Sequence, residues 1–469
     1  MASNWPRVRV SDVCELIVDC VNKTAPVSPV PTPYKMIRTP NIKNGRVSTD
    51  DCRCVDADTF AKWTRRATVE RNDVLLTREA PLGEVGIVNS SEQLFLGQRI
   101  MQYRADQSKL DPHFLLYSFL SPDLQHQFSM HEGSGSVVSH IRVGDCSKFE
   151  LNLPPLAMQK RISEILRNLD NRITLNRQIN QTLEQMAQTL FKSWFVDFDP
   201  VMDNALDAGN PIPDELQHRA EARKAVRESE GFNPLPDDVR QLFPDAFEES
   251  ELGWVPKGWS YSELGSLTDF ATGPVFKSSD FVPEGIRLAR GDNVKEGYFH
   301  WGDKARYWSE ITPKLEKYLL QANDILLGMD GSKVGKNWCK VTPSDLPCLL
   351  VQRVARLRET SKIGASMLEV IISGSSFKKY VDNVKTGTSI PHISGKQIKE
   401  FEVLMPPFTS GIVECFEKLM QPIAQRRLAS TGEIISLTSL RDTLLPKLIS
   451  GELRLDDVET AVEQETVSA

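Results

Sequence analysis

The sequence has few cysteines, no long apolar run and no overall excess of basic residues. Its 469 residues contain 8 cysteines, too few for a disulfide-stapled scaffold, and Cys52 and Cys54 are too close together for the Cys-x-x-Cys pattern of zinc or redox sites. No apolar segment approaches the roughly 20 residues that span a bilayer, and no basic and apolar leader opens the chain. We therefore expect reduced thiols, a cytoplasmic location and no membrane association.

The chain also lacks the positive charge of many nucleic-acid-binding proteins, since its formal net charge is -7. The charge is unevenly distributed. Residues 1–153 carry 18 basic and 18 acidic side chains and residues 254–407 carry 21 and 17, whereas residues 200–253 carry 5 and 13 and residues 408–469 carry 6 and 10. The whole-chain charge therefore does not exclude nucleic-acid binding. The alternative is that acidic linkers merely keep the protein soluble.

The sequence repeats itself once, at a spacing of about 252 residues, as between His140 and His392. Matching pairs in the same order are residues 38–45 and 290–297, 72–76 and 323–327, 84–86 and 333–335, 98–99 and 352–353, and 140–141 and 392–393. The spacing is far longer than the roughly 20 to 50 residues of a solenoid repeat. We infer a duplicated domain.

Each copy combines short strand-like runs with turns rich in Gly, Pro, Asn and Ser and a few helical stretches, such as residues 113–120. The expected fold class is α+β (mixed), with two homologous domains and two long helices. The expected divisions are a first domain at 1–153, a helix at 154–199, an acidic linker at 200–253, a second domain at 254–407, a second helix at 408–451 and an acidic, flexible tail at 452–469.

Apolar residues recur at steps of three and four after each domain, which predicts two amphipathic, coiled-coil-like helices. The stripe comprises Leu166, Leu169, Ile173, Leu183, Met186, Leu190 and Trp194 in the first helix and Leu437, Leu440, Leu444 and Leu448 in the second. Pro422, Gly432 and Pro446 make the second less regular. We expect the helices to cover each other; packing of each helix on its own domain is the less favoured alternative.

No convincing catalytic or metal site is found. Met405-Pro406-Pro407-Phe408 is similar to the Asn/Asp-Pro-Pro-Phe/Tyr loop of amino-methyltransferases, but Met405 cannot accept the hydrogen bond required there. Residues 331–337 look superficially like a phosphate loop, but have the wrong spacing between glycines and Asn337 after the lysine. The 7 histidines lack metal-ligand partners at helical spacing. These features favour a binding protein.

Two nonidentical domains, each followed by Pro-Pro and a long helix, resemble the specificity subunit of type I restriction-modification enzymes. Three segments carry this resemblance: LNLPPLAMQKRISEILRNLDNRITLNRQINQTLEQMAQTLFKSWFVDFDPV from Leu151, LFPDAFEESELGWVPKGW from Leu242 and RDTLLPKLISGEL from Arg441. The resemblance implies two target recognition domains that each read half of a split DNA sequence. It also implies an antiparallel helix pair that separates them and docks modification subunits, to which a translocating restriction subunit is added.

The same resemblance implies that the chain is not an enzyme by itself and binds no cofactor. S-adenosylmethionine, ATP and magnesium are expected on the partner subunits, and two copies of the modification subunit on equivalent faces of the helix pair. Two alternatives stay open: a standalone DNA methyltransferase or nuclease with an unrecognised site, and a duplicated protein-protein scaffold. Because the domains are nearly neutral, the isolated chain should bind DNA poorly and the assembled complex should bind it well.

The candidate DNA-contacting residues are polar or basic side chains in turns, since Arg, Lys, Ser and His can pair with bases or phosphates. They are Arg78, Arg99, Ser136, Ser139, His140 and Arg142 in the first domain and Lys333, Lys336, Arg353, Lys385, Ser389 and His392 in the second. A buried role in holding the sheet is an equal alternative for Arg99 and Arg353. A loop-anchoring role is an equal alternative for His140 and His392.

The first helix is also expected to act as a ruler between the two half-sites. Residues 159–196, if helical, span about 57 Å at roughly 1.5 Å per residue. At roughly 3.4 Å per base pair this length limits the separation of the half-site centres to about 17 base pairs.

Overall fold

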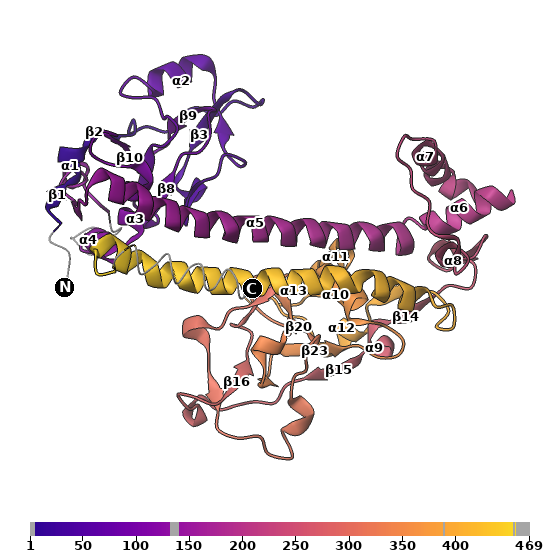
Figure 1. Ribbon diagram of the computed structural model, residues 1–469. Coiled ribbons are helices and arrows are strands. Elements are labelled where there is room, and N and C mark those ends of the chain that lie inside the picture. Colours follow the sequence, from indigo (N-terminus) through magenta and orange to yellow (C-terminus); the bar gives the residue numbers. More distant parts are fainter. Residues whose placement is uncertain (1–4, 132–139, 388–389, 454, 456–469) are drawn as a thin grey trace. The chain divides into compact units, whose positions relative to one another are not determined.

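The computed structural model describes residues 5–131, 140–387, 390–453 and 455. The chain divides into two units, of which unit 1 comprises residues 1–177 and 431–469 and unit 2 comprises residues 178–430. Two long helices, α5 (Leu156–Phe195) and α13 (Ile412–Ser450), each contribute one part to each unit (Figure 1). Most of the acidic tail expected at 452–469 lies outside the described residues.

Unit 1 is a mixed domain followed by the first part of α5. Its strands are β1 (Arg7–Arg9), β2 (Cys14–Asp19), β3 (Tyr34–Ile37), β4 (Ile42–Lys43), β5 (Gly45–Val47), β6 (Arg53–Cys54), β7 (Val74–Arg78), β8 (Leu82–Ile87), β9 (Gln93–Leu96), β10 (Ile100–Ala105) and β11 (Glu150–Asn152). Its shorter helices are α1 (Val10–Val13), α2 (Ala57–Trp63), α3 (Pro112–Leu120) and α4 (Pro122–Ser129).

The main sheet of unit 1 has the strand order β2-β10-β7-β8-β5-β4, and β3 lies between β6 and β9 in a smaller sheet. Strand β7 is central because Val74, Leu75 and Leu76 are all buried, so the strand is covered on both faces. Helix α3 begins where Asp111 accepts a hydrogen bond from the Phe114 N–H at 2.9 Å, with proline in its first turn. The helical stretch expected near residues 113–120 is thereby confirmed.

Unit 2 contains the second mixed domain. Its strands are β12 (Phe247–Ser250), β13 (Gly253–Pro256), β14 (Ser260–Glu263), β15 (Asp269–Thr272), β16 (Ile286–Ala289), β17 (Val294–Lys295), β18 (Tyr298–Phe299), β19 (Tyr307–Trp308), β20 (Ile325–Gly328), β21 (Trp338–Lys340), β22 (Cys348–Leu350), β23 (Val354–Arg358) and β24 (Glu402–Met405). Its shorter helices are α6 (Asp199–Ala208), α7 (Gln217–Arg227), α8 (Asp237–Arg240), α9 (Leu264–Leu267), α10 (Ala365–Ser373), α11 (Ser375–Val384) and α12 (Gly395–Lys399).

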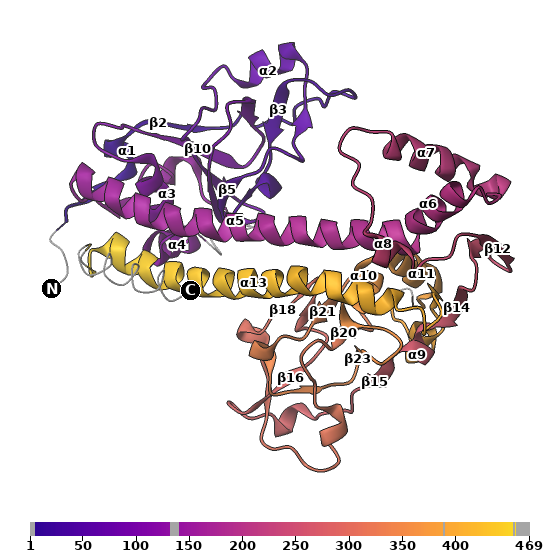
Figure 2. The same ribbon diagram turned by 45° about the vertical axis from the view of Figure 1, so that its right-hand side comes forward.

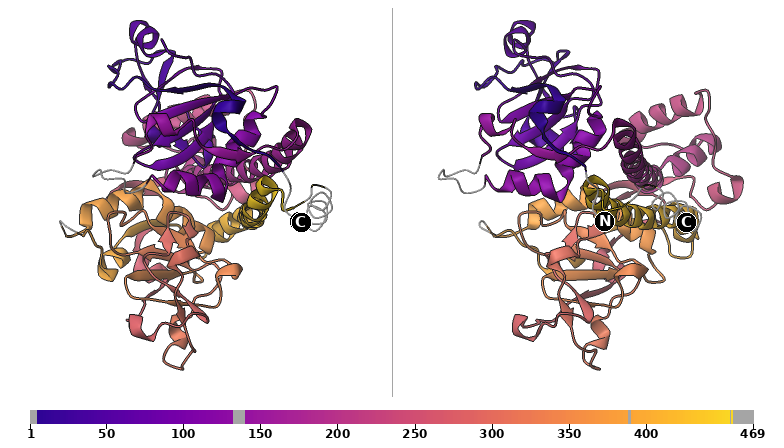
Figure 3. Two further views of the ribbon diagram at one scale, coloured as in Figure 1. Left: turned by 90° about the vertical axis from the view of Figure 1, so that its left-hand side faces the viewer. Right: turned by 60° about the vertical axis from the view of Figure 1, so that its left-hand side comes forward.

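The second domain repeats the topology of the first. The sheet order β15-β23-β20-β21 corresponds to β2-β10-β7-β8, and β16 pairs parallel with β22 as β3 pairs with β9. The pairing of β14 with β24 corresponds to that of β1 with β11. The duplication inferred from the sequence and the mixed α+β fold class are therefore confirmed. Figure 3 shows that each copy contains both strands and helices.

A buried carboxylate marks the same place in both copies. Asp73 and Asp324 are each 1% exposed. Asp73 accepts hydrogen bonds from Arg104 at 2.8 and 2.9 Å, and Asp324 accepts them from Arg358 at 2.6 and 2.8 Å. The bidentate geometry satisfies both oxygens of each acid. Because each aspartate directly precedes β7 or β20, the pair fixes the start of that strand to the strand that carries the arginine, β10 or β23.

One pair of segments that match in sequence does not occupy equivalent positions in the two domains. The sequence aligns residues 84–86 with 333–335, but the strand registers pair Leu76 with Val85 and Leu327 with Trp338. Trp338 is therefore the counterpart of Val85. The segment between β7 and β8 comprises residues 79–81, whereas that between β20 and β21 comprises residues 329–337. The second domain thus has a longer loop. The sequence-based alignment of residues 84–86 with 333–335 is therefore wrong.

In unit 1 the two long helices pack on each other and on the domain. The Arg441 guanidinium donates to Asp170 at 2.9 Å and that of Arg172 to Glu433 at 2.5 Å, so the helices run antiparallel here. One apolar core joins strand and α3 residues to both helices, whose contributions include Leu166, Leu169, Ile173, Leu437, Leu444 and Leu448, with Leu440 packed against it. The two helices therefore pack on each other, as expected. They also pack on the domain, which was the less favoured alternative.

In unit 2 the later residues of α5 pack against the start of α13. Trp194 is 1% exposed, and its ring centroid lies 6.0 Å from that of Phe416. Leu190 packs against the same core, and Leu183 is half-buried. Met186, expected in the stripe, is 51% exposed because its face of the helix has no covering element among the described residues. Helix α13 continues through Pro422, Gly432 and Pro446 despite their low helix propensity.

The segment expected as an acidic linker is folded. Residues 200–253 contain most of α6 together with α7, α8 and β12 (Figure 2), and Met202, Leu216 and Ala220 form a small buried core there. Several of its acids are paired: Arg223 donates to Asp203 at 2.6 Å, and Arg227 to Asp207 at 2.6 Å. Arginines from one helix therefore neutralise acids from another, which the net charge of the segment conceals.

Candidate functional site

In unit 1, three segments far apart in the sequence meet where β7 ends. The Arg78 N–H donates to the Arg99 carbonyl at 2.8 Å, and the Ile141 N–H donates to the Arg78 carbonyl at 2.9 Å. The Arg78 side chain also donates to the Ile141 carbonyl at 3.1 Å. We call this place, comprising residues 78–79, 98–99 and 140–142, the first strand-end surface. It brings together Arg78, Arg99, His140 and Arg142 from the sequence-predicted set.

Unit 2 builds the same arrangement after β20. The Met329 N–H donates to the Arg353 carbonyl at 2.9 Å, and the Ile393 N–H donates to the Met329 carbonyl at 2.9 Å. Residues 329–330, 352–353 and 392–393 form the second strand-end surface. Arg353 and His392 therefore correspond to Arg99 and His140 in space as well as in sequence.

One arginine in each surface, Arg99 or Arg353, points outward. The side chains of Arg99 and Arg353 are 52% and 60% exposed, so the alternative of a buried pair holding the sheet is wrong. Arg99 lies 2.7 Å from the Glu79 carboxylate and Arg353 lies 3.9 Å from that of Asp330. Both arginines have positive φ, 73° and 70°. In each arginine the backbone carbonyl accepts a hydrogen bond at the strand end, while the guanidinium stays accessible.

The histidine of the second surface anchors its loop. The His392 N–H donates to the Thr386 carbonyl at 2.8 Å, and the Thr386 N–H donates back at 2.9 Å. The His392 Nε2 also lies 3.0 Å from the Thr386 hydroxyl. These contacts favour the loop-anchoring role for His392. His140 is half-buried beside Ile141.

The other predicted contact residues are more scattered. Arg142 is exposed in the first strand-end surface, just before a short 3-10 turn. Lys336 is exposed in the loop 329–337, and Lys385 forms an ion pair with Asp382 at 2.5 Å. This lysine holds the pKa of the Asp382 carboxyl below its usual value through a hydrogen bond. Ser136, Ser139 and Ser389 lie outside the described residues.

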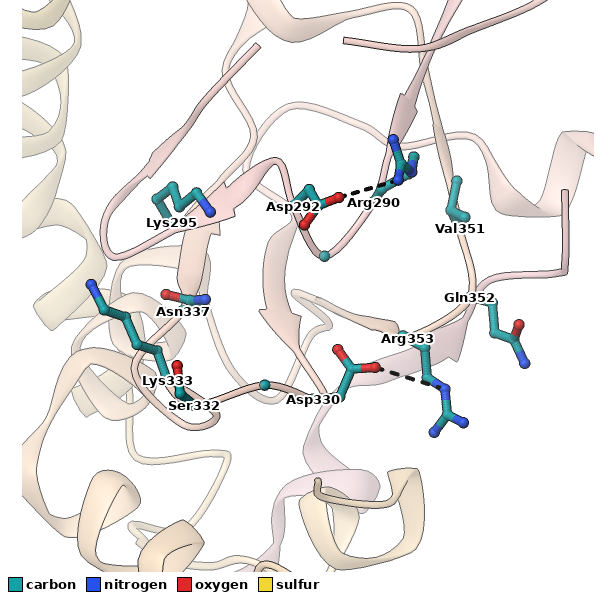
Figure 4. Close-up of a pocket in the computed structure, with 12 residues that line it drawn as sticks. Arg290, Asp292, Lys295, Asp330, Ser332, Lys333, Asn337, Val351, Gln352 and Arg353 are labelled. Carbon is teal, nitrogen blue, oxygen red and sulfur yellow. Dashed lines mark hydrogen bonds and ion pairs between the residues drawn. The ribbon is translucent and has the colours of Figure 1, made fainter. Parts of the chain in front are cut away.

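A polar hollow of about 600 Å³ opens beside the second strand-end surface. Figure 4 shows Arg290 paired with Asp292, and Arg353 paired with Asp330, among its lining residues. Lys295 and Lys333 also line it, and among the described residues neither ammonium has an ion-pair partner. The lining therefore has more cations than acids, which suits an anionic ligand.

The sequence missed several residues of this hollow and its neighbour. A second hollow, of about 430 Å³, shares two residues with the first. Lining residues absent from the sequence-predicted set include Arg290, Lys295, Asn337, Gln352, Lys396 and Lys399. The repeated phrases at 290–297 and 352–353 contain three of these, so repetition itself was a usable signal. Asn337, Lys396 and Lys399 lie outside the matched phrases.

Catalytic chemistry has little support in the described part of the chain. No group of three or more His, Cys, Asp or Glu residues is placed to hold a metal there. All eight cysteines are free, and burial raises the pKa of Cys52 and of Cys146 to about 11. Those two thiols stay protonated at neutral pH and are poor nucleophiles. Among the described helices, none has the length and apolar character that crossing a membrane requires.

Comparisons with known proteins agree with this architecture. Residues 2–185 match the family model of the type I restriction modification DNA specificity domain. The chain is 24% identical to the HindI specificity subunit of Haemophilus influenzae, over 83% of this chain and 88% of that protein. It is 25% identical to the MjaVIII specificity subunit of Methanocaldococcus jannaschii, over 77% and 75%.

A similar fold has been solved for a type I restriction-modification S subunit from M. genitalium. The TM-score is 0.55 at 16% identity, and the match covers 95% of this chain and 96% of that structure. This likeness supports the fold, and the family model and curated relatives supply the relationship. Over residues 2–185 the chain matches the specificity-domain model, and over most of its length it is similar to type I restriction enzyme specificity subunits.

Proposed function

We propose that this chain reads a bipartite DNA sequence, one half-site with each duplicated domain, within a complex that methylates adenine. Specificity subunits are the non-catalytic recognition component of type I systems. The observation that carries the proposal is the pair of equivalent strand-end surfaces, each of which exposes an arginine on the same backbone scaffold. Two variants of one domain suit two different short sequences, because each domain reaches only a few base pairs.

The partners supply the chemistry in this proposal. Two modification subunits dock on α5 and α13 and hold S-adenosylmethionine, and restriction subunits hold ATP and magnesium. Exposed apolar residues on the helices, including Met186, are available for such docking. The complex works in the cytoplasm, where its DNA target lies.

The complex should methylate one bipartite motif, and the purified chain alone should methylate none. Adding the modification subunit should also strengthen DNA binding, because the domains themselves have little net positive charge. Sequencing of methylated adenines and binding titrations at several salt concentrations measure both effects. Methylation by the chain alone would identify a standalone enzyme. Absence of salt-dependent DNA binding by the complex would favour a protein-protein scaffold.

We further propose that the first hollow of unit 2 reads bases of the second half-site. Asn337 lies in the loop that is longer in the second domain, and an amide can pair with two atoms of adenine. Asn337→Ala should remove about 1–3 kcal/mol of discrimination at one base pair. Its methylated motif should be relaxed in one half-site only. Lys314→Ala, at an exposed site outside both hollows, is the control. An unchanged motif in the Asn337 variant would exclude this residue as a reader.

A further inference from the structure

Arg99 and Arg353 occupy one structural position in two domains that otherwise differ around them. The Arg99 carbonyl accepts the N–H of Arg78 at 2.8 Å, and the Arg353 carbonyl accepts the N–H of Met329 at 2.9 Å. The acid beside each arginine comes from the next residue of that strand end, Glu79 or Asp330. The backbone, the cation and the acid are therefore all repeated.

The backbone conformation is unfavourable for arginine. With φ of 73° and 70°, both residues lie in the left-handed region, which is strained for a residue with a Cβ. Glycine would adopt this conformation without that strain. The presence of arginine in both copies indicates a use for the side chain that is separate from the turn.

That use is not stabilisation of the domain. Both guanidinium groups are more than half exposed, and exposed ion pairs contribute little to folding. The acids instead restrict the direction in which each guanidinium points. A planar guanidinium presents two parallel N–H groups, which match the oxygens of a phosphate. Arg353 also lines both hollows of unit 2, so a strand that enters either passes beside it.

The surroundings of the two arginines differ. Arg78 in the first domain is replaced by Met329 in the second, and residues 79–81 correspond to the longer segment 330–337. Two domains that read different bases still meet the same sugar-phosphate backbone, which carries no sequence information directly. A residue kept constant amid varying neighbours is suited to this common feature.

We propose that Arg99 and Arg353 each hold a DNA backbone phosphate at the corresponding position of the two half-sites. The inference rests on the proposed DNA-reading function and separates the residues that bind the DNA backbone from those that read bases. The repeated arginines set the position of each domain on the duplex. The segments that differ between the domains, such as residues 329–337, read the bases.

The test uses the complex with its modification subunits and a duplex that contains the methylated motif. Arg353→Ala should weaken binding about tenfold and reduce the steepness of the salt dependence by about one phosphate contact, with the motif unchanged. Arg99→Ala should do the same. The double variant should lose about a hundredfold, because the two arginines belong to different units.

Arg353→Gly separates a DNA contact from a structural role. Because glycine tolerates the positive φ, this variant should unfold no more easily than wild type and still lose about tenfold in affinity. A changed base preference in either single variant would overturn the phosphate assignment. Unchanged affinity and salt dependence would also overturn it. Failure of the unaltered complex to bind or methylate any bipartite motif would instead refute the proposed function.

Discussion

A four-residue insertion in both long helices should lengthen the unread gap of the methylated motif by about two base pairs. Helix α5 is continuous over 40 residues, or about 60 Å. Four residues add about 6 Å, and base pairs are about 3.4 Å apart. The insertions belong between Arg177 and Gln178 and between Ser430 and Thr431, where the chain passes from one unit to the other. Mapping of methylated adenines gives the new gap directly.

Insertion of four residues in both helices at these two sites keeps the helix contacts of each unit intact. Asp170 and Arg441 remain together in unit 1, and Trp194 and Phe416 remain together in unit 2. Insertion in α5 alone is the informative control, since it adds length to one helix without the other and should reduce methylation. Deletion of four residues at both sites should shorten the gap. Full methylation with an unchanged gap in the matched variants would refute the ruler.

Replacing a buried aspartate of the repeated scaffold should cost about 3–5 kcal/mol in unfolding free energy. Asp324→Ala takes the buried partner from the Arg358 guanidinium, which is 20% exposed, and leaves it only the longer contact to Asp269 at 3.9 Å and the Leu319 carbonyl. It also removes the acceptor of the Gln321 N–H, at 2.7 Å. Hydrogen exchange of the amides in β20 and β23 measures the loss within unit 2, where a single global transition is not assured.

The equivalent change in the first domain provides an internal replicate. Asp73→Ala removes the buried partner of Arg104, which keeps Glu70 at 2.9 Å, and one of the two acceptors of the Gln102 side chain, at 2.7 Å. Exchange should then accelerate in β7 and β10. Glu400→Ala, which removes an exposed i, i+4 partner of Lys396, should change stability by no more than about 0.5 kcal/mol. Losses below about 1 kcal/mol at both aspartates would show that these pairs do not hold the sheets.

The sequence was most informative where structure depends on local pattern or on order along the chain. Apolar residues at steps of three and four predicted α5 and α13, because the apolar face of a helix depends only on residues that are close together in the sequence. Collinear repeats predicted the duplicated domain without any knowledge of its fold. The mixed α+β class followed from short strand runs among turns and helices, and the observed sheets agree.

Sequence reasoning failed where similar letters were taken for similar positions. Residues 333–335 resemble residues 84–86, yet the strand register makes Trp338 the counterpart of Val85. Register is decided by cross-strand hydrogen bonds and by which face is buried. The folded state of residues 200–253 was missed for a related reason, since its net charge gave no sign of the Arg223–Asp203 pairing.

The amino-acid sequence by itself determined the two copies, the two helices and the absence of a recognisable catalytic motif. Tertiary structure decided which side chains act together. Arg99 and Ile141 both contact Arg78 because β7 ends there, and Arg99 combines a positive φ with a contact between its guanidinium and Glu79. Such convergence depends on hydrogen bonds between residues far apart in the chain, and no local periodicity encodes it.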